Sequence, residues 1–165
     1  MSTQDNLMEA FAGESQANRR YLAFARKADK DGFPNVARIY RAIAEAETVH
    51  ALKHLEVAGE IGEVADNLVA SEEGERHEYT VMYPEFIEEA EEEGHSRALR
   101  GFRQANEAEK VHGKIFSRLL TAVQKGDDGP GGNVEMCPVC GWVGLEDIPE
   151  RCPICNTPSE RFESF

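Results

Sequence analysis

Carboxylates and imidazoles recur on the apolar stripes of the predicted helices, and this pattern constrains the fold more than any other feature. Between residues 4 and 124, apolar or special residues return at steps of three and four, the spacing of helices packed in a bundle. In the stretch ETVH, Glu47 and His50 lie three residues apart, so both side chains leave the same helix face. Ile43 lies on that stripe too, which predicts a core position. An ionised Glu in a core is strongly unfavourable without a partner, so the fold must supply one.

Three breaks divide this region into four predicted helices. DGFPN (31–35) and EEGHS (92–96) are short, so the helices that each of them joins are predicted to be antiparallel neighbours. The middle break, AGEIGEVADN (58–67), has ten residues and would reach about 33 Å if fully extended. It is long enough either to cross the bundle or to pass to another subunit.

The charge balance excludes several classes of partner. Acidic residues outnumber basic ones 31 to 18, and the formal net charge is -13, which repels nucleic acid and anionic membrane surfaces. A hydrophobic content of 41% nevertheless favours a packed protein over a disordered one. The apolar runs are far shorter than the roughly 20 residues that span a bilayer, and the N-terminal stretch lacks the apolar region of a signal peptide. We therefore expect a cytoplasmic protein with no membrane and no nucleic-acid partner.

The composition changes after Lys125. We predict a helical bundle over residues 1–125, a flexible linker over 126–133 that contains GDDGPGG, and a small metal-binding domain over 134–165. The last segment holds all four cysteines and the only Trp.

Each predicted helix places at least one carboxylate on its inner stripe. The first contributes one Glu, the third contributes two Glu one turn apart in ERHE, and the second and fourth each contribute Glu-x-x-His. A lone Glu paired twice with Glu-x-x-His is the ligand set of carboxylate-bridged two-metal sites in helical bundles, and this chain adds one further Glu. The candidate ligands are Glu14, Glu47, His50, Glu75, Glu78, Glu109 and His112.

The alternative interpretation is that these carboxylates belong to a solvated acidic surface. With 24 Glu and 5 His in the chain, a Glu three residues before a His is expected about 0.7 times by the spacing rule alone. It occurs three times, and one case, Glu92 with His95, straddles Gly94 and falls off the stripe. The remaining two lie on inner faces, which favours metal. Two irons would bring positive charge into the core, and the carboxylates would neutralise this charge and bridge the two metals. One imidazole nitrogen would bind each iron.

The C-terminal cysteines form two pairs, CPVC and CPIC, separated by 11 residues. In a cytoplasmic protein such tight turns are typical of a metal site with four thiolate ligands, rather than of disulfides. The predicted ligands are Cys137, Cys140, Cys152 and Cys155. Iron and zinc both suit a tetrahedron of four sulfurs, so the ligands alone leave the metal open.

The stretches GESQANRRYLAFA, AEAETVHALKHL, EGERHEYTVMYPEF and ANEAEKVHGKIF, followed by the two cysteine pairs, resemble the rubrerythrin family over nearly the whole chain. The resemblance implies an all-α, ferritin-like four-helix bundle with a di-iron site, joined to a small C-terminal rubredoxin-like FeS4 domain. It assigns two irons to the seven bundle ligands, which then act in catalysis. It assigns one iron to the four cysteines, although the protein as isolated could hold zinc there. It also implies that one iron shifts between His50 and Glu78 as the redox state changes.

The implied activity is a peroxidase that reduces hydrogen peroxide to water in oxidative-stress defence. Electrons would enter through the FeS4 centre from a donor protein such as a rubredoxin or its reductase. The 126–133 linker leaves one end of a long bundle whose ligands lie near its middle. We therefore expect a homodimer in which the FeS4 domain of one chain serves the di-iron site of the other.

Two other functions fit parts of the sequence. A ferroxidase or oxidase that handles iron with oxygen would use the same bundle ligands, but it has no need for an appended electron-transfer domain. A zinc-ribbon docking module would explain the cysteines, but it leaves the inner carboxylates without a role. Colour separates the last alternative, because a ferric site with four sulfurs is red and a zinc site is colourless.

Overall fold

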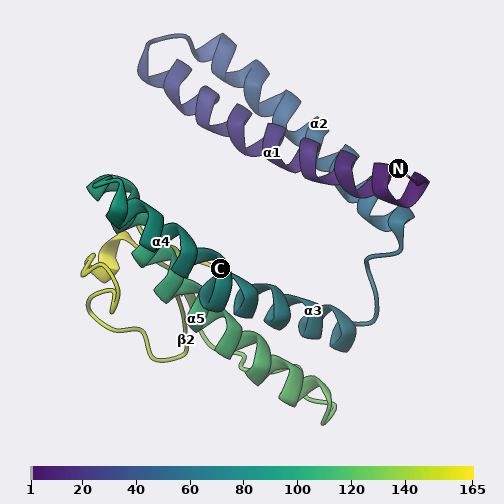
Figure 1. Cartoon of the computed structure of the whole chain (residues 1–165), viewed down its shortest axis with the longest axis vertical. Helices are drawn as coiled ribbons and strands as arrows, with labels where there is room; N and C mark the ends of the chain where they lie inside the picture. Colours follow the sequence, from purple (N-terminus) through teal and green to yellow (C-terminus); the bar gives the residue numbers. More distant parts are fainter. Residues whose placement is uncertain (1) are drawn as a thin grey trace. The chain divides into compact units, whose positions relative to one another are not determined.

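The computed structural model describes residues 2–165 and divides the chain at Gly62 into two compact units. The first unit holds helices α1 (Thr3–Lys30) and α2 (Pro34–Ala58). The second holds α3 (Val64–His77), the π-helical segment η1 (Glu78–Met82), α4 (Tyr83–Glu92), α5 (Ser96–Val123) and the cysteine domain (Figure 1). The expected helices are therefore present, and none of the described ones is long and apolar enough to cross a membrane.

Helices α1 and α2 form an antiparallel hairpin with a seam of small side chains (Figure 1). Ser2 caps α1 by accepting a hydrogen bond from the Asp5 backbone N–H, while the Asp5 carboxylate accepts one from the Ser2 N–H. Gly32, at φ 84°, forms the turn, and Pro34 opens α2. The buried residues along the seam are Ala25, Ala28, Ala37, Ala44 and Ala51. Such small residues let the two helix backbones approach closely, but they bury little apolar area.

The C-terminal end of α2 is held firmly. Gly59 ends the helix in the left-handed conformation at φ 76°, and the Glu60 N–H donates back to the Leu55 carbonyl at 3.2 Å. The Gln4 side chain, at the start of α1, donates to the Ala58 carbonyl at 2.9 Å. Only residues 59–63 therefore connect the two units.

This connection is half the length of the ten-residue break predicted from the sequence. Residues 64–67 are helical and form the first turn of α3. Asp66 lies in that turn, where a negative charge is favoured by the helix dipole. The prediction of a non-helical segment as far as residue 67 was wrong for this reason.

The third predicted helix is interrupted by η1. The Tyr83 N–H bonds to the carbonyl of Glu78, five residues earlier, instead of four. Pro84 follows directly, and it has no N–H to give to Thr80 in a regular α-helix. The helix recovers its α geometry from Tyr83 onward, after η1 has shifted its phase relative to α3.

The cysteine domain is a three-stranded antiparallel sheet with the order β2–β1–β3. Its strands are β1 (Val134–Met136), β2 (Val143–Leu145) and β3 (Glu163–Ser164), with a single 3₁₀ turn, η2 (Ser159–Arg161), before β3. Trp142 packs against Phe162 with ring centroids 5.6 Å apart, and Val111 of α5 packs against the same cluster. The domain thus folds back onto α5 of its own chain, where Arg118 also pairs with Glu146 at 2.6 Å.

Gly144→Ala is expected to destabilise the cysteine domain, because an added Cβ would lie 2.3 Å from the Trp142 ring. The ring is nearly buried and is held by Phe162, so it cannot move aside freely. We expect a loss of about 1–3 kcal/mol, typical of overpacking. Denaturant unfolding followed by the fluorescence of the single Trp measures it. Gly131→Ala is the matched control, because nothing lies within 4 Å of its Cβ position; equal midpoints for both variants would contradict this packing.

Candidate metal centres

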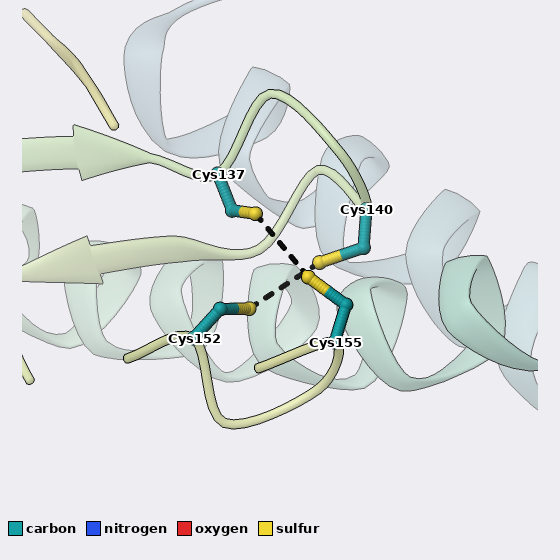
Figure 2. Close-up of side chains that lie close together, drawn as sticks. All are labelled: Cys137, Cys140, Cys152 and Cys155. Atoms are coloured by element: carbon teal, nitrogen blue, oxygen red, sulfur yellow. Dashed lines mark hydrogen bonds between the residues drawn. The ribbon is translucent and has the colours of Figure 1, made fainter. Parts of the chain in front are cut away.

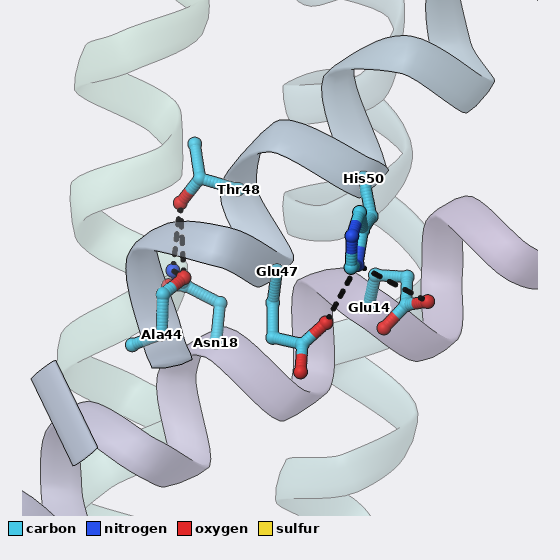
Figure 3. Close-up of polar contacts among 6 residues, drawn as sticks. All are labelled: Glu14, Asn18, Ala44, Glu47, Thr48 and His50. Atoms are coloured by element: carbon cyan, nitrogen blue, oxygen red, sulfur yellow. Dashed lines mark hydrogen bonds and ion pairs between the residues drawn. The ribbon is translucent and has the colours of Figure 1, made fainter. Parts of the chain in front are cut away.

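The α1–α2 hairpin brings three predicted ligands together (Figure 3). The Nδ1 atom of His50 lies 3.1 Å from a carboxylate oxygen of Glu47 and 4.0 Å from one of Glu14. Glu47 and His50 leave one face of α2 because they are three residues apart, and Glu14 reaches them from α1. The His50 side chain is 56% exposed, whereas that of Glu47 is 15% exposed. This group is a half-site with two carboxylates and one imidazole.

The second unit carries a matching group on α3 and α5. The Nδ1 atom of His112 lies 2.6 Å from Glu109 and 3.9 Å from Glu75. The His112 side chain is only 22% exposed. Burial and, after it, the nearby Glu109 carboxylate raise the pKa of Glu75 to about 7. A cation bound between these two carboxylates would stabilise both of them in the ionised form.

Glu78 lies outside this group of three, although it belongs to the predicted ligand set. It is the first residue of η1, and burial, followed by the charge of Glu109, raises its pKa. Burial and the charges of Glu109, Glu78 and Glu75 also raise the pKa of Tyr83. Its hydroxyl therefore keeps its proton close to these carboxylates. In contrast, Tyr21 packs among aromatic rings, with its centroid 6.0 Å from that of Tyr40.

His112 also connects the helices to the cysteine domain. Its Nε2–H donates to the Gly141 carbonyl at 2.9 Å, which leaves Nδ1 to face Glu75 and Glu109. A second partner of this kind orients a metal-binding imidazole and sets its tautomer. Gly141 directly follows Cys140 and takes the left-handed conformation at φ 80°. The sequence places the linker at one end of the bundle, but the cysteine domain folds back along α5 and contacts His112 of its own chain. The expected service of one chain's iron pair by the other chain's FeS4 domain stays a prediction.

The four cysteines converge as predicted (Figure 2). The Sγ atoms of Cys137 and Cys155 are 3.5 Å apart, and those of Cys140 and Cys152 are 3.4 Å apart. A metal at about 2.3 Å from each sulfur requires edges of about 3.8 Å, so small movements suffice to bind it. Burial raises the pKa of Cys140 and of Cys152, so a cation is needed to hold these sulfurs as thiolates.

Two buried asparagines lie within one helical turn of the ligands but were not predicted as site residues. Asn18, one turn after Glu14, donates to the Ala44 carbonyl at 2.7 Å and to the Thr48 hydroxyl at 2.8 Å (Figure 3). These bonds lock α1 to α2 beside the ligands. Asn106, three residues before Glu109, has a buried side-chain oxygen with no partner among the described residues. Each asparagine occupies a position that the helical spacing assigns to the buried face. A polar residue at such a position was the signal that could have identified both.

The donors fit iron in both kinds of centre. Carboxylates with one imidazole suit ferrous and ferric ions, and four thiolates suit a single iron. In the half-site on α3 and α5, the Glu109 carboxylate raises the pKa of Glu75, and a bound cation would relieve that repulsion. His54, Glu45 and His77 belong to none of the groups with metal-site geometry.

The rubrerythrin sequence family matches residues 5–120, and the rubredoxin-like domain of rubrerythrin matches residues 136–163. Rubrerythrin-2 of Clostridium acetobutylicum is 36% identical, over 99% of this chain and 96% of that protein. Nigerythrin of Nitratidesulfovibrio vulgaris is 35% identical, over 99% of this chain and 87% of that protein. Solved structures of nigerythrin in the partially reduced and the fully reduced, all-ferrous states align with TM-score 0.59 at 32% identity, covering 100% of this chain and 87% of theirs.

Glu75 and Glu78 should differ in their effect on iron binding. Glu75→Ala removes one of the three grouped donors, so the variant should lose most of the iron that the helices bind. The Glu78→Ala variant should retain iron in the reduced state. Because Glu78 is the surplus carboxylate, its variant should instead oxidise abnormally. Iron analysis of anaerobically loaded protein, with an absorption spectrum of each redox state, measures both effects. Equal iron loss in the two variants would show that Glu78 is an ordinary permanent ligand.

Proposed function

Because the chain belongs to the rubrerythrin family, and so is a ferritin-like di-iron oxidoreductase with a rubredoxin-like iron site, we propose that it is a peroxidase that reduces hydrogen peroxide to water. The balanced reaction takes one peroxide, two electrons and two protons to two waters. The proposal assigns two irons to the two half-sites together, with seven ligands: Glu14, Glu47, His50, Glu75, Glu78, Glu109 and His112. When bound, this pair supplies the two electrons.

The observation that carries the proposal is the hydrogen bond from His112 to Gly141. It joins a helical ligand to the residue next to Cys140, so a short path of bonded atoms connects the cysteine site to the half-site on α5. A storage ferroxidase takes electrons from its substrate iron and has no use for such a path. The contact therefore supports electron entry through the cysteine site, from a donor such as a rubredoxin or its reductase.

The surroundings of His112 suit peroxide chemistry. A pocket bordered largely by apolar side chains, among them Ile115, Phe116 and Val143, reaches Glu75 and His112. The Tyr83 hydroxyl keeps its proton near the carboxylates and can donate a hydrogen bond to an oxygen bound there. Among the predicted ligands, His50 is the exposed imidazole and Glu78 the ungrouped carboxylate, which is consistent with an exchange of these two between redox states.

Rapid mixing of the fully reduced protein with each oxidant tests the proposal. Peroxide needs only the two electrons of the iron pair, whereas oxygen needs four to reach water. We expect peroxide to re-oxidise the pair at least about tenfold faster than oxygen, a barrier difference of about 1.4 kcal/mol. Equal rates, or a faster reaction with oxygen, would favour the ferroxidase or oxidase alternative.

A zinc-substituted cysteine site provides the matched control for electron entry. With zinc at the cysteines, the reduced iron pair bound by the helices should still react once with peroxide at an unchanged rate. Repeated turnover with a rubredoxin as donor should fall to the background, because zinc cannot change its oxidation state. Undiminished turnover would show that electrons reach the iron pair by another route.

A further inference from the structure

We propose that the Thr157 hydroxyl raises the reduction potential of the iron held by the four cysteines, through a hydrogen bond to the sulfur of Cys155. The Oγ1 atom of Thr157 lies 3.1 Å from the Sγ atom of Cys155. Thr157 is also one of three polar residues that are buried among residues 2–165. The inference requires iron at the cysteines, and it does not require that the helical irons reduce peroxide.

The two cysteine pairs share one backbone framework. The Cys137 N–H donates to the Trp142 carbonyl at 2.8 Å, and the Cys152 N–H donates to the Thr157 carbonyl at 2.8 Å. In both turns the residue after the second cysteine is left-handed, at φ 80° in one and 61° in the other. Thr157 and Trp142 therefore occupy equivalent positions, and what distinguishes them is the side chain.

These two side chains treat the neighbouring sulfur differently. The backbone N–H of Trp142 donates to Cys140, and that of Thr157 donates to Cys155. Trp142 directs its ring toward Phe162, with centroids 5.6 Å apart. Thr157 instead adds its hydroxyl to the sulfur that its own N–H already reaches. Cys155 thus has two hydrogen bonds from Thr157, where Cys140 has one from Trp142.

The hydroxyl is the donor once iron is bound. A sulfur that coordinates a metal has lost its proton, so it can only accept a hydrogen bond. A hydroxyl can donate as well as accept, and a buried one needs a partner. The Thr157 O–H therefore points at the Cys155 thiolate in the iron-bound site.

Such a hydrogen bond favours the reduced site. Reduction adds one electron from a donor protein to the ferric ion, and no bond is formed or broken. The ferrous site carries one more negative charge than the ferric site, and the sulfurs share that charge. A donor to sulfur therefore stabilises the ferrous state more than the ferric state, which raises the reduction potential.

The loop around Thr157 keeps the hydroxyl in place. Arg151 forms an antiparallel bridge with Pro158, and its side chain donates to the Asn156 carbonyl at 3.0 Å. The branched Thr side chain also has few rotamers. The donor is already oriented when the electron arrives, so little reorganisation accompanies the change in charge.

The reduction potential of variants of the full-length, iron-loaded protein tests the inference. Thr157→Val removes the hydroxyl and keeps the backbone hydrogen bonds. In a spectroelectrochemical titration of the red ferric band, we expect its potential to fall by about 59 mV, which corresponds to a tenfold change in the equilibrium constant for one electron. An unchanged potential would overturn the proposal.

Two further variants at this position keep the test valid if Thr157→Val binds iron poorly. Thr157→Ser retains the hydroxyl and should stay close to the wild-type potential, whereas Thr157→Ala should fall below it. Equal potentials in these two variants would contradict the proposal. Thr121→Val is the matched control, because it removes a hydroxyl on α5 that bonds only to the Ser117 carbonyl, at 2.9 Å; its potential should not change.

The absorption spectrum separates a bond to sulfur from a general change in packing. A hydrogen bond lowers the energy of the sulfur electrons, so its loss should move the sulfur-to-iron charge-transfer band of Thr157→Val to longer wavelength. A lower potential with an unmoved band would show that solvation of the site had changed instead, and would refute the inference.

Neither measurement uses peroxide, so the proposed peroxidase activity can fail while this inference holds. If both hold, Thr157→Val should slow reduction of the cysteine iron by a rubredoxin. The single reaction of the fully reduced iron pair with peroxide should keep its rate.

Discussion

Repulsion between the Glu75 and Glu109 carboxylates is the interaction on which the chemistry of the second unit depends. Glu75 and Glu109 approach one imidazole closely enough for burial and mutual charge to raise the pKa of Glu75 to about 7. Apolar residues of similar size would pack at these positions without that penalty. Their retention makes sense when cations occupy the space between the helices, so assembly of the helices and binding of iron become one process.

Helix α5 carries two residues of the helical half-site and packs against the cysteine cluster. One face presents Glu109 and His112, and Val111 of the same turn packs against the Trp142 cluster around the cysteines. The cysteine domain is too small to form much of a core, so its metal and its contact with α5 stabilise it together. The same contact fixes the orientation of His112 through the Gly141 carbonyl. Structural support and the proposed route for electrons therefore use the same few residues.

The sequence predicted the fold class, the helices and the cysteine cluster because each rests on local spacing. Glu-x-x-His places two donors on one helix face, and each cysteine pair needs only its own turn. Three features depended on context that spacing does not carry. The π-helical segment that begins at Glu78 follows from backbone hydrogen bonding around Pro84. Helix α3 begins at residue 64, earlier than the apolar spacing indicated. The docking of the cysteine domain depends on contacts with α5. The domain boundary near residue 126 and the seven-ligand set remain predictions.

Iron binding by the helices couples two parts of the chain that fold as separate compact units. Each half-site alone offers two carboxylates and one imidazole, and the proposed pair of irons requires both half-sites. The chain carries a formal charge of -13, and bound cations offset part of the resulting self-repulsion. Iron would then stabilise the assembled half-sites, and their assembly would stabilise bound iron, by the same coupling free energy in both directions.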